Sequence, residues 1–157
     1  MPARRRKDEV SAFERSAEVV WEGALADGNG TASATSSGAF GDLAVTWSSR
    51  VEQAGGRTSP EELLAASHAA CFAMAFSNVL DSDGHDPERL QVRAVVSAEL
   101  GEGGLTVTSR TIDVRGRVAG IDDAAFGAAA EEAERNCPIS NALRGNLDIR
   151  VHARLES

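Results

Sequence analysis

Residues 63–80 are apolar on nearly every side of the helix that they predict. Ser59 is a suitable N-cap, Pro60 fits the first helical turn, and Glu62 stands three residues after Ser59, so a capping box is expected to open this helix. A helix without a polar face must be enclosed by other elements. Because a chain of 157 residues can hardly wrap this helix alone, we expect a second copy of the chain to cover the rest of it.

The remaining segments predict mainly strands. They are a hairpin over residues 17–36, a third strand over 43–50, strands over 92–100 and 105–118, a helix over 124–135, a short helix over 138–143 and a strand over 147–155. This order has no βαβ rhythm, so it favours an α+β fold whose largely antiparallel sheet holds the long central helix on one face. A change of apolar parity between Val107 and Ile112 predicts a β-bulge near residues 109–111. The apolar stripe of the second helix is expected to be buried: Phe126, Ala129, Ala130 and Ala133.

Length and composition indicate one soluble domain. With 42% hydrophobic residues, residues 17–157 can form a single core, whereas residues 1–16 are expected to be a disordered or arm-like segment. The net charge of -8 disfavours general nucleic-acid binding. Neither a long uninterrupted apolar run nor a signal-peptide pattern is visible, so we expect a cytoplasmic protein that does not bind membranes.

Cys71 and Cys137 are the two cysteines of the chain. In a reducing compartment a static disulfide seldom persists, so the pair is interpreted as a redox couple, with buried inert thiols as the alternative. Cys71 lies in the middle of the long helix, where the helix N-terminus cannot stabilise a thiolate. A cation must therefore come from another segment, and Arg50 is the first candidate and Arg57 the second.

Cys137 stands directly before Pro138 and is expected at the N-cap of the short helix. Backbone N–H groups there would favour a thiolate, although a small residue filling a tight turn explains the position as well. The sequence distance to Cys71 excludes CxxC chemistry and does not establish contact between the two thiols.

A metal site is not expected. Among the cysteines and histidines, only His68 and Cys71 have a close spacing, whereas closed structural zinc sites need four ligands. His68 shares a helical face with Cys71 and could tune it, or it could be a core histidine with its hydrogen bonds satisfied.

Glu61 lies on the same predicted helix as Cys71, roughly 15 Å away along the axis at about 1.5 Å per residue. That distance is too long for a carboxylate to organise the thiol of its own chain. Two such helices crossing antiparallel about a two-fold axis would place the Glu61 of one chain near the Cys71 of the other.

Five motifs of the chain belong together: the run over residues 60–75, Trp21-Glu22-Gly23, the turn over residues 28–31, Ser49-Arg50 and the run Asn136-Cys137-Pro138-Ile139-Ser140. Together they resemble the OsmC branch of the OsmC/Ohr family of thiol peroxidases. The resemblance covers about residues 17–155. It implies an intertwined homodimer in which sheets enclose two long central helices.

The same resemblance implies roles for individual residues. Cys71 would be the peroxidatic thiol, Cys137 would resolve its sulfenic acid as a disulfide, Arg50 would hold the thiolate, and Glu61 would fix that arginine, with Arg57 as the fallback for Arg50. The expected reaction, in oxidative or osmotic stress defence, reduces organic hydroperoxides to alcohols, and hydrogen peroxide less well. It needs no cofactor and uses a dithiol reductant, for which a lipoyl-bearing protein is a candidate. A non-catalytic binding or redox-sensing protein of the same fold is the alternative.

Overall fold

The computed structural model describes residues 11–157, and the chain divides into two units, Met1–Thr58 and Ser59–Ser157. Of the expected N-terminal arm, residues 1–10 lie outside the described residues, and residues 11–16 have neither helix nor strand. The assignment of residues 17–157 to a single domain stays a prediction.

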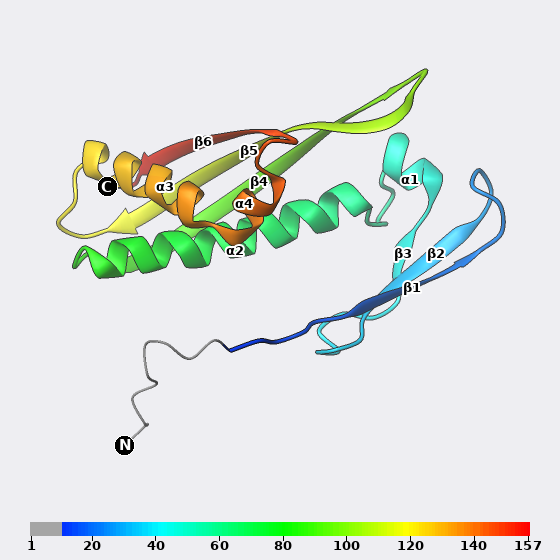
Figure 1. Cartoon of the computed structure of the whole chain (residues 1–157), viewed down its shortest axis with the longest axis horizontal. Coiled ribbons are helices and arrows are strands. Elements are labelled where there is room, and N and C mark those ends of the chain that lie inside the picture. The colour runs from blue at the N-terminus through cyan, green and yellow to red at the C-terminus, as the bar shows by residue number, and fades with distance from the viewer. Residues whose placement is uncertain (1–10) are drawn as a thin grey trace. The chain divides into compact units, whose positions relative to one another are not determined.

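The first unit contains an antiparallel sheet in the order β1 (Ala17–Glu22), β2 (Asn29–Ala34) and β3 (Leu43–Val45). The predicted hairpin is confirmed, with Ala17 opposite Ala34 and Glu22 opposite Asn29 (Figure 1). Gly30 lies under the ring of Trp21, where a Cβ atom would come within 2.8 Å of the ring. Only glycine therefore lets this tryptophan pack flat on the neighbouring strand.

The prediction of a strand over residues 43–50 is wrong beyond Val45. Helix α1 (Trp47–Val51) follows instead. Thr46 Oγ1 accepts a hydrogen bond from the Ser49 backbone N–H at 3.1 Å, and the Ser49 hydroxyl accepts one from the Thr46 N–H at 3.0 Å. This reciprocal capping box starts a helix. The alternation of Val45 and Trp47, which favoured a strand, is too short to distinguish a strand from a helix. Arg50 accordingly lies on a short helix.

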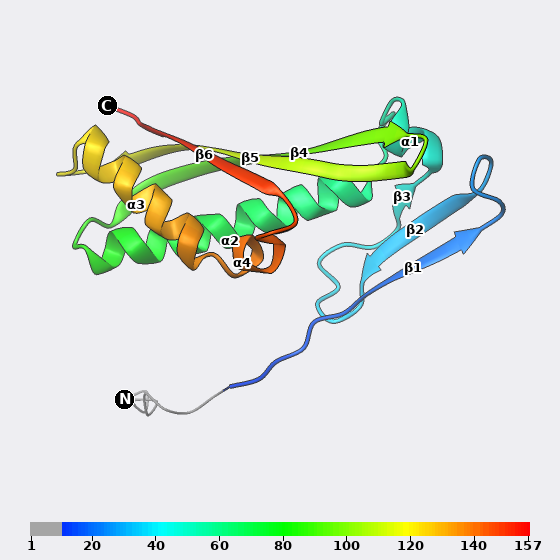
Figure 2. The ribbon, with the colours of Figure 1, turned by 45° about the horizontal axis from the view of Figure 1, so that its top comes forward.

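The second unit is a three-stranded sheet with its helices on one face (Figures 1 and 2). Its elements are α2 (Pro60–Ser82), β4 (Pro87–Gly101), β5 (Gly104–Val118), α3 (Asp123–Asn136), α4 (Pro138–Leu143) and β6 (Asp148–Leu155). The Ser59 hydroxyl accepts the Glu62 N–H at 3.1 Å, which confirms the predicted start of α2. Asp122 caps α3 in the same way, by accepting the Ala125 N–H at 2.8 Å.

The sheet order is β4-β5-β6, with β4 antiparallel and β6 parallel to β5. The expectation that no βαβ unit occurs is therefore wrong for β5 and β6. A parallel pair needs a crossover of about a dozen residues or more, and α3 together with α4 supplies one. The predicted bulge is present one residue early, because the pairing shifts between Ser97 and Ala98 and leaves Thr108 as the extra residue on β5.

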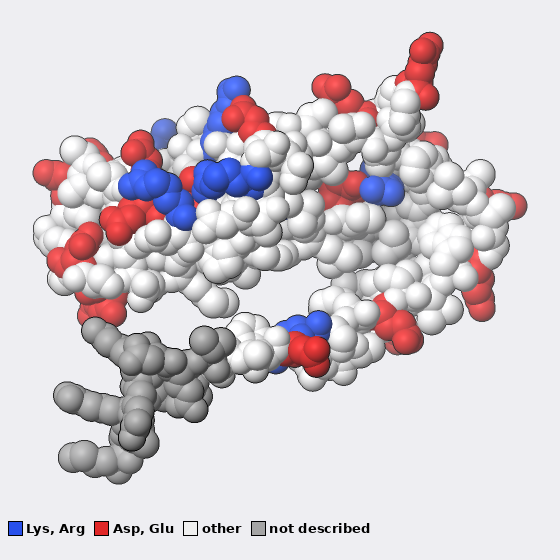
Figure 3. Space-filling model, viewed as in Figure 1, with Lys and Arg blue, Asp and Glu red and all other residues white. Residues whose placement is uncertain are grey.

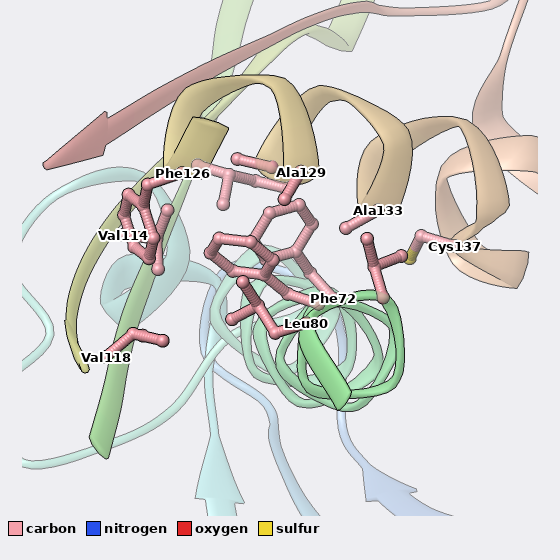
Figure 4. Close-up of a cluster of buried hydrophobic side chains, with 12 residues drawn as sticks. Phe72, Leu80, Val114, Val118, Phe126, Ala129, Ala133 and Cys137 are labelled. Carbon is pink, nitrogen blue, oxygen red and sulfur yellow. The ribbon is translucent and has the colours of Figure 1, made fainter. Parts of the chain in front are cut away.

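The core of the second unit lies between α2, α3 and β5 (Figure 4). The ring of Phe76 packs between Phe72 and Phe126, with centroid distances of 5.6 Å and 5.0 Å. Gly116 on β5 leaves room for Phe126, because a Cβ atom there would lie 2.5 Å from its ring. All four residues of the predicted α3 stripe are buried. Cys137 lies at the edge of this cluster (Figure 4).

Within the second unit, helix α2 is covered on one side only. Phe72, Phe76 and Leu80 are buried, whereas Met74 is 72% exposed and Ala66 and Ala70 are exposed as well. The helix is long and apolar enough to cross a membrane by length and composition. Its packing against β4 and α3 is that of a core helix with one apolar side left open.

Candidate active site

The two thiols, which the sequence left unconnected, lie in contact where α2 packs on α4. Cys71 is partly buried on α2, and Cys137 is completely buried immediately before α4. The two side chains interact, and both are free thiols. The N-cap position predicted for Cys137 is confirmed, although its sulfur makes no capping hydrogen bond.

The surroundings of Cys71 in the second unit disfavour its thiolate. Burial raises the pKa of Cys71 above its ordinary value, the backbone N–H of Ile139 opposes this rise, and the hydrogen bond and charge of Cys137 add to it. At neutral pH, the groups of the second unit therefore keep Cys71 in its thiol form. A thiolate requires a cation from elsewhere, as the position of Cys71 in the middle of a helix predicted.

A chain of three polar side chains runs beside the thiols: Arg110, His68 and Ser140. His68 Nε2 lies 2.7 Å from the Ser140 hydroxyl, and Arg110 Nη1 contacts His68 Nδ1. Because a guanidinium can only donate, Nδ1 must be the acceptor, and Nε2 carries the proton that is donated to Ser140. This geometry assigns a neutral histidine in one tautomer.

The electrostatics of His68 agree with that assignment. Burial, and then the positive charge of Arg110, lower the pKa of His68 from 6.5 to about 4. His68 is completely buried, and both its ring nitrogens are satisfied. Of the two interpretations of His68, the core histidine is therefore confirmed.

Arg110 is the residue that the sequence analysis missed. It is completely buried on β5, on the same face as Ile112 and Val114, and its partners across the strands are Val96 and Ile149. Burial lowers the pKa of Arg110, and the negative charge of an ionised Cys137 opposes that change. The even-numbered parity that Arg110 shares with Ile112 and Val114 was the available indication of an inward-facing charge.

The other predicted site residues lie at the ends of helices or in a loop. Arg50 is exposed in the last turn of α1, and Arg57 is exposed shortly before Thr58. Glu61 is a half-buried acid in the first turn of α2. Both arginines belong to the first unit and both cysteines to the second, so the pairing of Arg50 with Cys71 and Glu61 stays a prediction.

Acidic side chains are spread over the visible face of the protein, whereas Lys and Arg gather mostly over the second unit (Figure 3).

A hollow of about 470 Å³ on the sheet is lined by Gln91, Arg93, Asp113, Val114, Arg115, His152, Ala153 and Arg154. Neither cysteine lines it, so this hollow is not the thiol site. Within residues 11–157, no group of three or more His, Cys, Asp or Glu side chains could hold a metal ion.

Comparison with known proteins identifies the family of this chain. The family model described as OsmC-like protein matches residues 53–152. The chain is 33% identical to peroxiredoxin OsmC of Escherichia coli (strain K12) over 137 residues, which cover 87% of this chain and 94% of the relative. The chain belongs to the OsmC-like family, as the motifs around its cysteines predicted.

Solved structures agree with this assignment. The organic hydroperoxide resistance protein OhrB of Bacillus subtilis matches with a TM-score of 0.69 and 25% identity, over 90% of this chain and 98% of that one. An organic hydroperoxide resistance protein OsmC from Legionella pneumophila matches with a TM-score of 0.69 and 26% identity, over 92% and 99%. The mixed fold with two sheets and a long helix is thus the fold of OsmC and Ohr proteins.

Proposed function

We propose that the protein is a cysteine-based peroxidase that reduces organic hydroperoxides to alcohols, and hydrogen peroxide less well. The observation that carries the proposal is the contact between Cys71 and Cys137 in a chain of this family. Two thiols in contact can trap a sulfenic acid as a disulfide before it is oxidised further. Relatives named peroxiredoxin and organic hydroperoxide resistance protein support a role in peroxide defence.

The proposed reaction has three steps. The thiolate of Cys71 attacks the distal peroxide oxygen, so that an S–O bond forms, the O–O bond breaks, and the leaving alkoxide takes a proton to become the alcohol. The sulfur of Cys137 then attacks the Cys71 sulfenic acid, an S–S bond forms, the S–O bond breaks, and water leaves. A dithiol reductant restores both thiols by exchange and is itself oxidised to a disulfide. A lipoyl-bearing protein is one such reductant.

The activating cation in this proposal is Arg50, held by Glu61 of a partner chain, with Arg57 as the alternative. The raised pKa of Cys71 within its own unit supports the need for a cation from outside that unit. An arginine suits this task because one planar guanidinium can bind a thiolate and a carboxylate together.

The proposal also requires an intertwined homodimer. The exposed apolar side of α2, with Met74 72% exposed, supports it, because a second copy of α2 would cover that side. A homodimer would also bring the Glu61 of one chain toward the Cys71 of the other. We expect the dimer to be cytoplasmic and to act in oxidative or osmotic stress defence.

A turnover assay tests the proposed function. The reduced protein is given an organic hydroperoxide or hydrogen peroxide in excess, with dihydrolipoamide, dithiothreitol or thioredoxin as reductant. We expect many equivalents to be consumed, fastest with the organic hydroperoxide and a small dithiol. Cys71→Ser should abolish turnover, and Cys137→Ser serves as the matched cysteine variant that still oxidises once. Consumption that stops after one equivalent in the wild type would indicate a redox sensor and refute the enzyme.

A further inference from the structure

The two segments that carry the thiols are joined by a second contact, a hydrogen bond about one helical turn away from the sulfur atoms. His68 precedes Cys71 by three residues on α2. On the other segment, Ser140 follows Cys137, the N-cap of α4, by three residues. His68 Nε2 lies 2.7 Å from the Ser140 hydroxyl, and both side chains are 0% exposed. Because residues three apart share a helix face, this hydrogen bond and the thiol pair connect the same two segments side by side.

Arg110 sets the direction of this hydrogen bond. Its Nη1 contacts His68 Nδ1 from β5, and Nδ1 must accept because a guanidinium can only donate. Nε2 therefore carries the proton of the ring and donates it to the Ser140 hydroxyl. All three side chains are completely buried. Such a hydrogen bond is costly to break, because each buried group that loses its partner gains no water in exchange.

Helix α4 depends on contacts of this kind for its position. Its six residues make fewer than two helical turns, and a helix this short is not stable by itself in water. Ser140 is its buried residue, whereas Ile139 and Leu143 are half-buried. The start of α4 also presents the backbone N–H of Ile139 to Cys71. Loosening α4 would therefore displace both Cys137 and the N–H group that faces Cys71.

We propose that the hydrogen bond between His68 and Ser140 is a clasp that keeps Cys137 in contact with Cys71 through the redox cycle. Both clasp residues are positioning residues, because they act through the placement of α4. Two thiols already in contact can form an S–S bond by rotating their side chains, so the clasp is kept in the disulfide state. For its role in peroxide reduction this inference rests on the proposed function, in which the clasp raises the effective concentration of Cys137 at the Cys71 sulfenic acid.

A redox titration without peroxide tests the clasp. The reduced protein is equilibrated with mixtures of reduced and oxidised dithiothreitol, so that the two cysteines lose two hydrogens and form an S–S bond while oxidised dithiothreitol takes up both hydrogens. The thiols that remain are alkylated after acid quenching and counted by intact mass. Ser140→Ala should lower the equilibrium constant for disulfide formation by about 3- to 10-fold. Ser140→Thr, which keeps the hydroxyl, should recover most of that loss.

Asp122→Ala is the matched control. It removes the side-chain cap of α3 and lowers stability, but it lies at the opposite end of α3 from Cys137. Its equilibrium constant should equal that of the wild type, and an equal constant in Ser140→Ala would overturn the proposal. Circular dichroism checks that each variant folds.

Two substitutions of His68 carry the test if Ser140→Ala does not fold. Glutamine keeps a donor near the place of Nε2, whereas asparagine keeps only an acceptor near the place of Nδ1 and is too short to reach Ser140. The equilibrium constant should therefore fall by about 3- to 10-fold in His68→Asn and stay near that of the wild type in His68→Gln. Equal constants in these two variants would refute the clasp.

A measurement with peroxide connects the clasp to the proposed function. After one equivalent of organic hydroperoxide, dimedone should label the Cys71 sulfenic acid more strongly in Ser140→Ala than in Asp122→Ala, because Cys137 resolves it more slowly. Equal labelling in the two variants would refute the role of the clasp in resolving the sulfenic acid. A wild type that reduces no hydroperoxide while the redox titration shows the expected shifts would refute the proposed function and leave the clasp standing.

Discussion

Mild acid should destabilise this protein through His68. In the folded state, burial and the charge of Arg110 lower the pKa of His68 from 6.5 to about 4. Between these two values the unfolded chain binds a proton that the folded chain does not. The stability that His68 contributes is therefore fully present above pH 6.5 and is lost as the pH falls through this window.

The size of the effect follows from the two pKa values. Each pH unit within the window changes the free energy of unfolding by about 1.4 kcal/mol. Lowering the pH from 7 to 5 should therefore cost about 2 kcal/mol through His68 alone, and complete protonation about 3 kcal/mol. Such a loss is a large fraction of the net stability of a domain.

Urea unfolding at both pH values, at one fixed protein concentration, measures this effect in the wild type and in His68→Gln. Glutamine keeps a donor and an acceptor but cannot be protonated in this range. His85 and His152 remain in both proteins. The difference in stability loss between the wild type and the variant therefore reports on His68 alone. The wild type should lose about 2 kcal/mol more than the variant between pH 7 and 5. Equal losses in the two proteins would refute the assignment of a neutral buried histidine.

Three other changes test the core, the dimer and the activating cation. Phe126→Ala should destabilise the protein by about 3–5 kcal/mol in urea unfolding, because it empties the centre of the core. Met74→Lys should give monomers in sedimentation at micromolar concentration, since it places a charge on the exposed side of α2; an unchanged dimer would exclude this surface as the interface. Arg50→Ala should raise the pKa of Cys71 in the pH profile of its alkylation by about 1–3 units, and a shift in Arg57→Ala alone would move the role to Arg57.

Local features of the fold were predictable from the sequence because neighbouring residues determine them. Ser59 and Asp122 begin their helices with side-chain caps, and the buried stripe that includes Phe126 follows from helical periodicity. The helix after Thr46 was missed, because its capping box uses two hydroxyl residues in place of the more common acidic partner. The parallel pairing of β5 and β6 depends on how α3 packs, which no local pattern encodes.

The candidate site was predictable only in part, for a similar reason. The motifs around Cys71 and Cys137 identified the two thiols, but their contact depends on the packing of α2 against α4. Arg110 lies on an alternating strand, where a charged side chain is expected to face solvent. Only its shared parity with Ile112 indicated that it points toward the helices. A buried charged side chain such as Arg110 is therefore the part of the candidate site that the sequence pattern does not predict.

The most direct test of the central claim is intact-mass spectrometry after one equivalent of an organic hydroperoxide is added to the reduced protein. The account predicts that the wild type loses two hydrogens as the Cys71–Cys137 disulfide forms, and that a dithiol reverses this loss. Cys137→Ser should gain one oxygen, and a second when a further equivalent of hydroperoxide is added, because no thiol is left to resolve the sulfenic acid, whereas Cys71→Ser should stay unchanged. Oxidation of Cys71→Ser at the wild-type rate, or a wild type that gains oxygen without forming a disulfide, would contradict the account.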